Sequence, residues 1–212
     1  MPRIALFEKY TRYYDEWFEN NAAVYKAELK AIESLIPIRK KGVEIGVGGG
    51  RFAAPLNIPI GVEPSGRMAE LARKRGIEVH KGVAEKLPYN NEMFDFALMV
   101  TTICFVDDVE KAFEEAYRIL KPNGALIIGL VDRNSKLGQL YEASKNESLF
   151  YSDATFYTVE EVVSFLKNAG FQYFSFAQTL FSDLSKIRTS EPISKGYGKG
   201  AFVGISALKP RN

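Results

Sequence analysis

The sequence is poor in cysteine and histidine: its 212 residues include one cysteine, Cys104, and one histidine, His80. A single cysteine cannot form an internal disulfide, and it argues against a cysteine-based metal site. No stretch approaches the roughly 20 consecutive apolar residues of a membrane-spanning helix, and the N-terminus has no apolar signal-peptide core. These shortages predict a cytoplasmic protein that has no membrane partner.

The sequence also lacks an excess of charge of either sign. It has 28 basic and 26 acidic side chains and a net charge of +2, so no overall electrostatic field favours nucleic acid as a partner. What is present is an ordinary globular composition, with 46% hydrophobic and 25% charged residues. The length fits one domain over residues 1–212, with an N-terminal helical segment, 1–36, ahead of an α/β core, 37–212. The sequence does not define an oligomeric state.

The most informative stretch lies between Gly42 and Phe52, where an apolar strand leads into the glycine-rich loop 46–50. Glycine tolerates positive φ and lets a ligand approach the backbone closely. A second apolar strand, 58–62, follows and ends at the acid Glu63. A glycine loop, a second strand and a terminal carboxylate are the parts of a nucleoside-binding βαβ unit, in which the acid binds the ribose hydroxyls.

Strand and helix patterns alternate along the rest of the chain. Apolar runs predict strands at five further places: 77–80, 96–100, 125–131, 171–180 and 201–208. Helices follow residues that are suited to cap an N-terminus: Ser65, Asp107 or Asp108, and Thr158. This alternation favours parallel strands joined by crossovers in an open, doubly wound α/β sheet. The segment 182–200, rich in Ser, Lys and Gly, is expected to be a mobile loop.

Aromatic residues are concentrated in the N-terminal segment, between Phe7 and Phe18. Two interpretations stay open: the rings pack against the core, or they form a lid that folds over the glycine loop. A helix follows and is ended by Pro37. Because Glu28 interrupts the apolar stripe of this helix, we expect the helix to lie at the surface.

A basic run, 73–75, lies in the last turn of the helix that follows Ser65. In isolation such a run suggests a nucleic-acid patch. Its position at the end of a helix instead predicts that it compensates the helix dipole.

Two classes of nucleoside cofactor fit the glycine loop. Dinucleotide enzymes use the motif G-x-G-x-x-G/A, which fits the frame from Gly48 but fails from Gly46, where Arg51 occupies the last position. Pro55 follows at once, where a regular helix should begin, and Glu63 comes sooner than the roughly 20 residues expected between motif and acid. Both features count against a dinucleotide without excluding it.

One acid and three glycines form a longer pattern, E-x-G-x-G-x-G, at Glu44, Gly46, Gly48 and Gly50. The pattern resembles the class I S-adenosylmethionine-dependent methyltransferases, in the small-molecule group that includes the quinone-biosynthesis type. Further stretches resemble that family in the same order: 14–18, 61–68, 82–89, 94–95, 118–126 and 156–161. The resemblance implies a Rossmann-like, mostly parallel seven-stranded sheet with helices on both faces and an antiparallel C-terminal strand.

The resemblance also implies S-adenosylmethionine as the cofactor, held by Glu44 and the three glycines of the pattern. Glu63 would bind both ribose hydroxyls, because a carboxylate accepts two hydrogen bonds at once. Pro64 and Met68 follow in the same motif, and Met68 would pack beside the adenine.

A loop further along the chain would complete the adenine site. The backbone of Ala84 would contact a ring nitrogen, and Glu85 would accept a hydrogen bond from the adenine amino group. Many relatives carry Asp where this chain has Val83, so Glu85 is the nearby acceptor. Thr101 lies at the carboxyl end of a strand, where ligands bind in open α/β folds, and would touch the cofactor through its backbone.

We predict an enzyme that transfers a methyl group from S-adenosylmethionine to a small-molecule acceptor by direct in-line displacement. The N-P-P-aromatic motif of nucleic-acid amino methyltransferases is absent after Val100. Two alternatives stay open: an NAD(P)-dependent oxidoreductase, and a non-catalytic cofactor-binding module with the same fold. No metal site is predicted. No catalytic residue can be named, since His80, the obvious base, has no visible partner.

Overall fold

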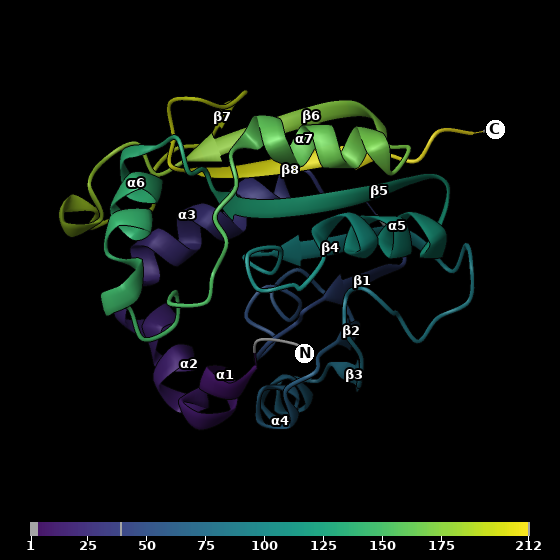
Figure 1. The fold of residues 1–212 in the computed structure, drawn as a ribbon, viewed down its shortest axis with the longest axis horizontal. Helices are drawn as coiled ribbons and strands as arrows, with labels where there is room; N and C mark the ends of the chain where they lie inside the picture. The colour runs from purple at the N-terminus through teal and green to yellow at the C-terminus, as the bar shows by residue number, and fades with distance from the viewer. Residues whose placement is uncertain (1–3, 39, 212) are drawn as a thin grey trace.

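In the computed structural model, residues 4–38 and 40–211 are described, so the first three residues of the expected N-terminal segment lie outside the description. The described residues form one eight-stranded sheet that is surrounded by helices (Figure 1). The strands are β1 Gly42–Ile45, β2 Ile60–Val62, β3 Glu78–His80, β4 Phe94–Val100, β5 Leu120–Val131, β6 Gln172–Thr179, β7 Ser194–Lys195 and β8 Phe202–Leu208.

The strand order is β3-β2-β1-β4-β5-β8-β6-β7. Strands β1 to β5 run parallel to one another, and β8 lies antiparallel between β5 and β6. The chain enters the sheet at β1, moves outward to β3 and then crosses to β4. The carboxyl ends of β1 and β4 therefore flank the switch point at which open α/β sheets bind ligands. The predicted doubly wound, mostly parallel architecture with an antiparallel C-terminal strand is confirmed.

The described sheet has eight strands, so the seven-stranded prediction is wrong by one. The additional strand, β7, is Ser194 and Lys195, which pair antiparallel with Gln178 and Ala177 at the edge of the sheet. It lies within 182–200, which we expected to be a loop. Both β7 side chains are exposed, so no apolar alternation marks this strand in the sequence, and only backbone pairing with β6 defines it.

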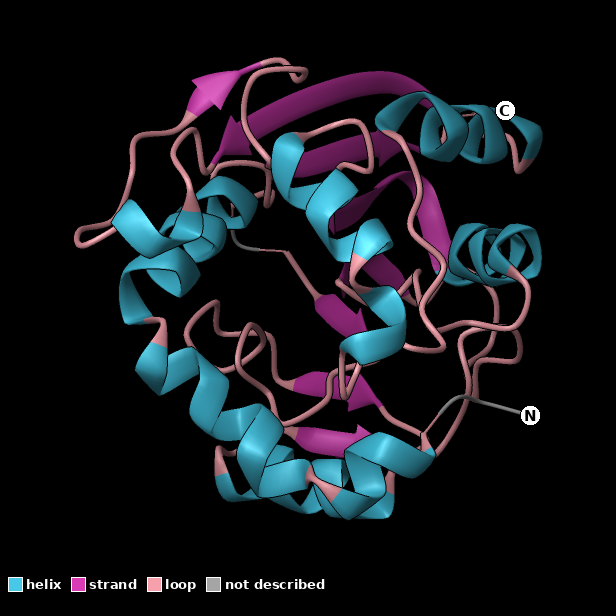
Figure 2. Cartoon of the chain, turned by 60° about the vertical axis from the view of Figure 1, so that its left-hand side comes forward, coloured by secondary structure: helices cyan, strands magenta, loops and turns pink. Residues whose placement is uncertain are grey.

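Helices cover both faces of the sheet (Figures 1 and 2). They are α1 Ala5–Lys9, α2 Thr11–Asn20, α3 Ala22–Glu33, α4 Gly66–Lys74, α5 Val109–Ile119, α6 Lys136–Ala143 and α7 Val159–Asn168, with short 3₁₀ helices at Lys145–Glu147 and Leu184–Lys186. Helices α3 and α4 pack in one layer, and α5 and α7 pack in the other. Among the helices of the described residues, none combines the length and apolar character needed to cross a membrane.

Three helix starts agree with the prediction, because their signals are local. The side chain of Ser65 accepts the backbone N–H three residues further on at 3.2 Å, and that of Asp108 does the same at 2.9 Å. Thr158 and Glu161 form a reciprocal capping box. After the glycine loop, residues 51–57 form turns and no helix, as Pro55 predicts.

The reason for one expectation about α3 is wrong. The helix does expose one face, with Lys26, Lys30 and Glu33, but Glu28 does not mark that face, because its side chain is only 6% exposed. Helix α3 lies against β5, β6 and β8, and the hydroxyls of Tyr14 and Tyr141 lie within electrostatic range of the Glu28 carboxyl. Burial raises the pKa of Glu28 to about 8. The local pattern could not show this, because the covering residues come from distant parts of the chain.

Candidate active site

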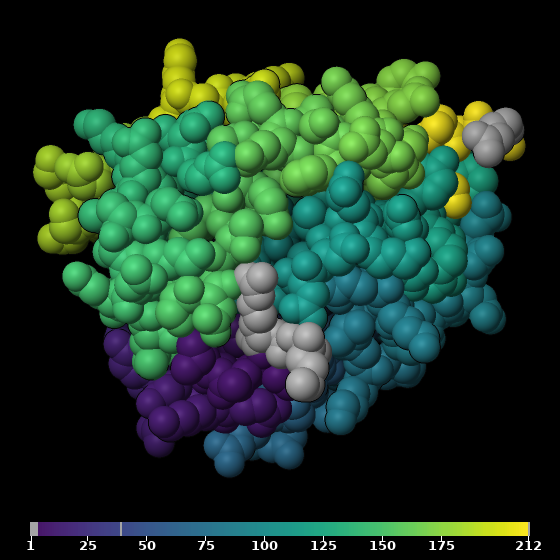
Figure 3. All heavy atoms as spheres, in the orientation of Figure 1, coloured from purple at the N-terminus to yellow at the C-terminus, as the bar shows by residue number. Residues whose placement is uncertain are grey.

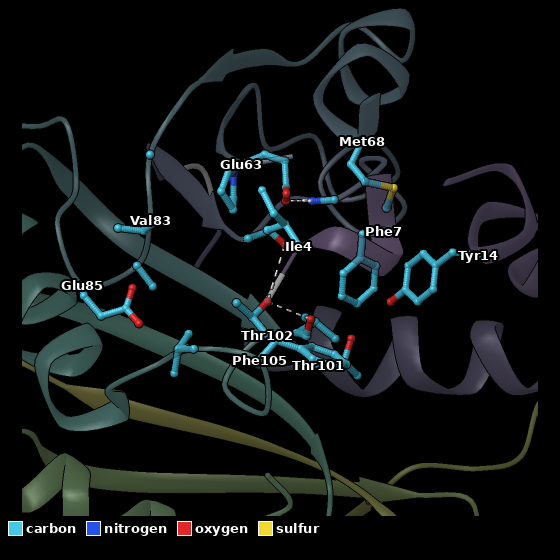
Figure 4. A pocket seen from close by; sticks show the side chains of 17 residues that line it. Ile4, Phe7, Tyr14, Glu63, Met68, Val83, Glu85, Thr101, Thr102 and Phe105 are labelled. Carbon is cyan, nitrogen blue, oxygen red and sulfur yellow. Dashed lines mark hydrogen bonds between the residues drawn. The ribbon is translucent and has the colours of Figure 1, made fainter. Parts of the chain in front are cut away.

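A pocket of about 110 Å³ opens at the switch point of the sheet (Figure 4). Gly46 and Gly48 follow β1, Glu63 follows β2 and Thr101 follows β4, and all four line this cofactor pocket. The sequence predicts each of them as a site residue. They meet because the carboxyl ends of parallel strands lie at the same edge of a sheet.

Glu63 is held in place by the backbone. The N–H of Gly48 donates to Oε2 at 2.8 Å, and the N–H of Ser65 donates to Oε1 at 2.9 Å. Burial raises the pKa of Glu63 to about 7, although both amide hydrogen bonds favour the charged form. Each oxygen keeps a second lone pair, so the carboxylate can accept one further hydrogen bond on each side. Two neighbouring ribose hydroxyls require such an acceptor pair.

The glycine loop has a shape that other residues disfavour, with φ of +70° at Gly46, +53° at Gly48 and +82° at Gly50. A Cβ on Gly46 would collide with the side chain of Thr102. Gly50 is predicted to contact the cofactor, but it is not among the residues that line the cofactor pocket. A Cβ on Gly50 would lie 2.5 Å from Cδ1 of Ile77, so this glycine allows the loop to pack against its neighbours.

Glu44 lines a smaller cavity that adjoins the glycine loop. Its side chain is buried, and Oε2 has no hydrogen-bond partner among the described residues. Burial raises the pKa of Glu44 well above its usual value, the backbone of Ala53 opposes the shift, and the charge of Glu63 adds to it. A buried oxygen without a partner costs free energy unless a ligand supplies a donor.

Three residues that the resemblance places near the adenine also line the cofactor pocket: Met68, Ala84 and Glu85. Pro64, from the same motif as Met68, lines it as well. Oε1 of Glu85 accepts the backbone N–H groups of Asp107 and Asp108, at 2.7 and 3.2 Å. One oxygen of Glu85 therefore holds the start of α5, and only the second can serve a ligand.

Aromatic residues of the N-terminal helices form one wall of the cofactor pocket. Figure 4 shows Phe7 and Tyr14, with Met68, on the side opposite Val83. The ring of Phe7 also stacks on Phe150, with centroids 5.6 Å apart. In Figure 3 the purple surface of the N-terminal helices accordingly adjoins the green surface of the segment that follows α6. The rings are therefore packed against other parts of the chain and also line the pocket.

A charged cluster joins α2 to the glycine loop. Asp15 accepts two hydrogen bonds from Arg51, at 2.8 and 2.7 Å, and one from Arg75 at 2.8 Å. Arg51 also pairs with Glu19 at 2.6 Å, and Arg75 donates to the backbone oxygen of Gly49. Burial alone would raise the pKa of Asp15, but the two arginines outweigh it and hold the pKa below its usual value. We call Asp15, Arg51 and Arg75 the Asp15 clamp.

A second cavity lies beyond Thr101, which lines it as well as the cofactor pocket. Its volume is about 30 Å³, less than a third of that of the cofactor pocket. Tyr141, Tyr151 and Phe156 contribute rings to its wall. Thr101 has a φ of +50°, which is rare for a β-branched residue and typical of strained backbone at functional sites.

The residues of the cofactor pocket fit S-adenosylmethionine. Glu63 offers a pair of acceptors for a ribose, and Glu44 offers an unpaired buried oxygen for an amino group. The turns at 51–57 supply no helix N-terminus after the loop, which a pyrophosphate would require and S-adenosylmethionine, lacking phosphate, would not.

The described residues contain no group of three or more His, Cys, Asp or Glu side chains that could hold a metal. His80 does not line the cavities described above. Its Nε2 lies 3.0 Å from Oε1 of Glu78, at the surface.

Comparisons with known proteins identify the family to which the chain belongs. A family profile described as a methyltransferase domain matches residues 43–128. An S-adenosylmethionine-dependent methyltransferase from Thermotoga maritima, whose crystal structure is known, shares 54% sequence identity with this chain. The two structures superpose with a TM-score of 0.95, and the match covers 97% of this chain and 99% of that one. The chain belongs to the class I S-adenosylmethionine-dependent methyltransferases, and it is an enzyme that transfers a methyl group from S-adenosylmethionine. This membership decides against both alternatives that the sequence left open.

Particular relatives extend the comparison. The Thermotoga protein is described as a possible histamine N-methyltransferase. An uncharacterised protein of Methanocaldococcus jannaschii is 47% identical over 204 residues, which cover 96% of this chain and 98% of that protein. A demethylmenaquinone methyltransferase of Chlorobaculum parvum is 31% identical over 110 residues, covering 48% of this chain and 46% of that one. The predicted resemblance to the quinone-biosynthesis group is confirmed.

Sequence reasoning missed the Asp15 clamp. Arg51 was the one member of the clamp that looked unusual in the sequence, because it stands where a dinucleotide motif from Gly46 needs a small residue. Asp15 lies in a stretch that resembles the family, but its partner is 36 residues away and no spacing rule joins them. Arg75 belongs to the basic run expected to offset a helix dipole, and its hydrogen bonds show a second role in the clamp.

Proposed function

We propose that the cofactor pocket binds S-adenosylmethionine chiefly through Glu63. The observation that supports this most strongly is that each carboxylate oxygen accepts one backbone amide. Each oxygen therefore keeps a free lone pair, and the two lone pairs can accept hydrogen bonds from a ligand in the pocket. Gly46 and Gly48 let the cofactor approach the backbone, and the unpaired oxygen of Glu44 accepts from the amino group.

The remaining predicted residues contact the adenine and the methyl group of the cofactor. The ring of Pro64 and the thioether of Met68 pack on the adenine, and Ala84 and Glu85 offer it backbone and carboxylate hydrogen bonds. Thr101 lies where the cofactor pocket meets the second cavity, so it stands beside the methyl group.

Isothermal titration with S-adenosylmethionine tests the site. Glu63→Ala should weaken binding by about 1–3 kcal/mol, the usual cost of losing hydrogen bonds to a charged group. Glu70→Ala is the matched control, because Glu70 is exposed on neighbouring α4, and its affinity should equal that of the wild type. The proposal is wrong if the wild-type protein does not bind at millimolar cofactor, or if Glu63→Ala binds unchanged.

We also propose that the acceptor is a small molecule that enters the second cavity. The small volume of that cavity and its aromatic walls support this, as does the small molecule in the description of the Thermotoga relative. With methyl-labelled cofactor and a cell extract, label should accumulate in the low-molecular-weight fraction. Label found only in protein or nucleic acid would contradict the proposal.

Finally, we propose that residues 1–212 work as one methyltransferase domain, in which 1–36 form a lid on the core 37–212. The contacts of Phe7 and Tyr14 with the pocket support this, as does the Asp15 clamp. A closed lid excludes water from the reacting groups. The cytoplasmic location stays a prediction of the sequence.

A further inference from the structure

Two adjacent residues in the segment after α6, Phe150 and Tyr151, contact different parts of the site. The ring of Phe150 packs on three rings of the N-terminal helices. Its centroid lies 5.6 Å from that of Phe7, 6.1 Å from that of Tyr13 and 5.2 Å from that of Tyr14. Of these three residues, Phe7 and Tyr14 line the cofactor pocket. Phe150 therefore joins its segment to one wall of the cofactor pocket.

The ring of Tyr151 lies at the second cavity, which it lines. Its centroid is 4.9 Å from that of Tyr141 and 5.5 Å from that of Phe156, and both of these residues line the same cavity. One residue of the segment thus contacts the wall of the cofactor pocket, and the next residue forms a wall of the second cavity.

The backbone of this segment makes local contacts. The N–H groups of Glu147, Ser148 and Ala154 donate to carbonyl oxygens three residues earlier, at 3.0, 3.1 and 3.0 Å. Such turns do not tie the segment to the sheet, and residues 144–153 are all exposed or half-buried. Segments of this kind open at low cost in free energy. The ring contacts therefore determine where the segment lies. We call residues 144–154 the acceptor flap.

Building on the proposed function, we propose that the acceptor flap closes together with the N-terminal helices, and that Phe150 couples the two, so that a bound cofactor completes the second cavity. A cofactor in its pocket contacts the wall formed by Phe7 and Tyr14, and it thereby holds α1 and α2 in place. The helices then offer Phe150 a fixed surface on which to pack. The flap, once held, keeps Tyr151 at the second cavity.

This coupling gives the reaction a preferred order of binding. The flap is closed in a larger fraction of molecules when the cofactor is bound, so the acceptor binds more tightly to the cofactor complex than to the free protein. Coupling between two ligands is reciprocal, so an acceptor that contacts Tyr151 also strengthens cofactor binding. Departure of the methylated product removes that contact and loosens the spent cofactor. Phe150 is in this sense a positioning residue.

Hydrogen exchange tests the inference without an acceptor. The probe is S-adenosylhomocysteine, the cofactor without its methyl group, and amide exchange is followed by mass spectrometry in the free and the saturated protein. Binding should slow exchange in residues 5–20. It should also slow exchange in the acceptor flap, by about fivefold or more, although the residues that line the cofactor pocket include none from the flap.

Phe150→Ala should abolish the slowing that the ligand causes in the flap. It should leave the slowing in residues 5–20, and an affinity for S-adenosylhomocysteine within about threefold of the wild type shows that the variant is folded. Phe150→Tyr keeps the ring and should restore the effect. Leu149→Ala is the matched control, since Leu149 is exposed in the same segment. A merely structural role for Phe150 would change flap exchange equally with and without ligand.

A second variant reaches the flap from the other side. Asp15→Asn removes a contact of α2 with the glycine loop and leaves the sequence of the flap unchanged. Because it loosens the helices on which Phe150 packs, it should reduce the slowing in the flap even when the ligand is saturating.

The inference is overturned if the wild-type protein binds S-adenosylhomocysteine while exchange in the flap stays the same, or if Phe150→Ala keeps the wild-type slowing. Calorimetry measures the binding separately, so the proposed cofactor site still stands in both cases. If the wild-type protein does not bind the ligand at all, the proposed function fails, and this inference fails with it.

Discussion

Three buried acids share an unusual property at the scale of the residue: burial raises the pKa of Glu28, Glu44 and Glu63 above the ordinary value of 4.5. A carboxyl with a raised pKa binds its proton more tightly in the folded chain than in the unfolded one. Its contribution to stability is therefore present below about pH 4.5 and is lost as the pH rises through the folded pKa, about 8 for Glu28 and about 7 for Glu63.

We therefore expect the ligand-free protein to lose stability between about pH 5 and pH 8. Glu28→Gln removes one source of this loss, so its free energy of unfolding should rise relative to the wild type as the pH increases, by on the order of a few kcal/mol at about pH 8. Urea unfolding across this range measures the effect, with Glu33→Gln as the control. A difference between Glu28→Gln and wild type that stays constant with pH would contradict the assignment.

Single residues also show what the sequence could predict. Glu63 and the glycines Gly46 and Gly48 are recognisable because their signal is local, at the end of a strand. Asp15 is an ordinary acid by that standard, since its partners Arg51 and Arg75 are brought to it by the fold. The burial of Glu28 likewise depends on the fold and leaves no local signal. Gly50 adds a point that the motif does not show: a Cβ there would lie 2.5 Å from Cδ1 of Ile77, so a glycine is also needed for close packing.

At the scale of elements, the Asp15 clamp determines how α2 lies over the glycine loop. The side chains of Asp15 and Arg51 are each 16% exposed, so this ion pair is screened less by water than one at the surface. Helix α1 has no buried residue of its own. Its position beside the pocket therefore depends on contacts with α2 and α4 and on ring contacts such as that of Phe7 with Phe105.

Asp15→Asn should loosen the N-terminal helices, because it leaves two arginines without their shared carboxylate. We expect faster amide hydrogen exchange in residues 5–20 and a loss of cofactor affinity of about 1–3 kcal/mol. Glu16→Gln is the control, since Glu16 pairs with Arg12 at the exposed surface, where such pairs contribute little. Unchanged exchange in Asp15→Asn would show that the clamp does not hold the helices.

The strands and helices were easier to predict than the contacts between them. Caps such as Ser65 and Thr158 act within one turn of a helix, and the apolar runs of β4 and β5 are long. The edge strand β7 carries no such run, and the contacts that close α1 and α2 over the sheet join segments far apart in the chain.

At the scale of the whole molecule, a bound cofactor would bridge the ends of three strands and the N-terminal helices. Binding to the folded state alone stabilises it, by about 2.7 kcal/mol when the ligand is present at about a hundred times its Kd. S-adenosylhomocysteine should therefore raise the melting temperature by roughly 5–10 °C for a chain of this size. Scanning calorimetry measures this, with NAD as the control. An equal shift with NAD would contradict the cofactor assignment.

Arg51 has a consequence for how such a loop can evolve. It occupies the position that the dinucleotide motif from Gly46 reserves for glycine or alanine, and it also holds Asp15 and Glu19 of α2. A substitution to alanine would complete that motif and, in the same step, release the N-terminal helices from the loop. In the frame from Gly46, the mutation that completes the dinucleotide motif therefore also removes the ion pairs that tie α2 to the loop.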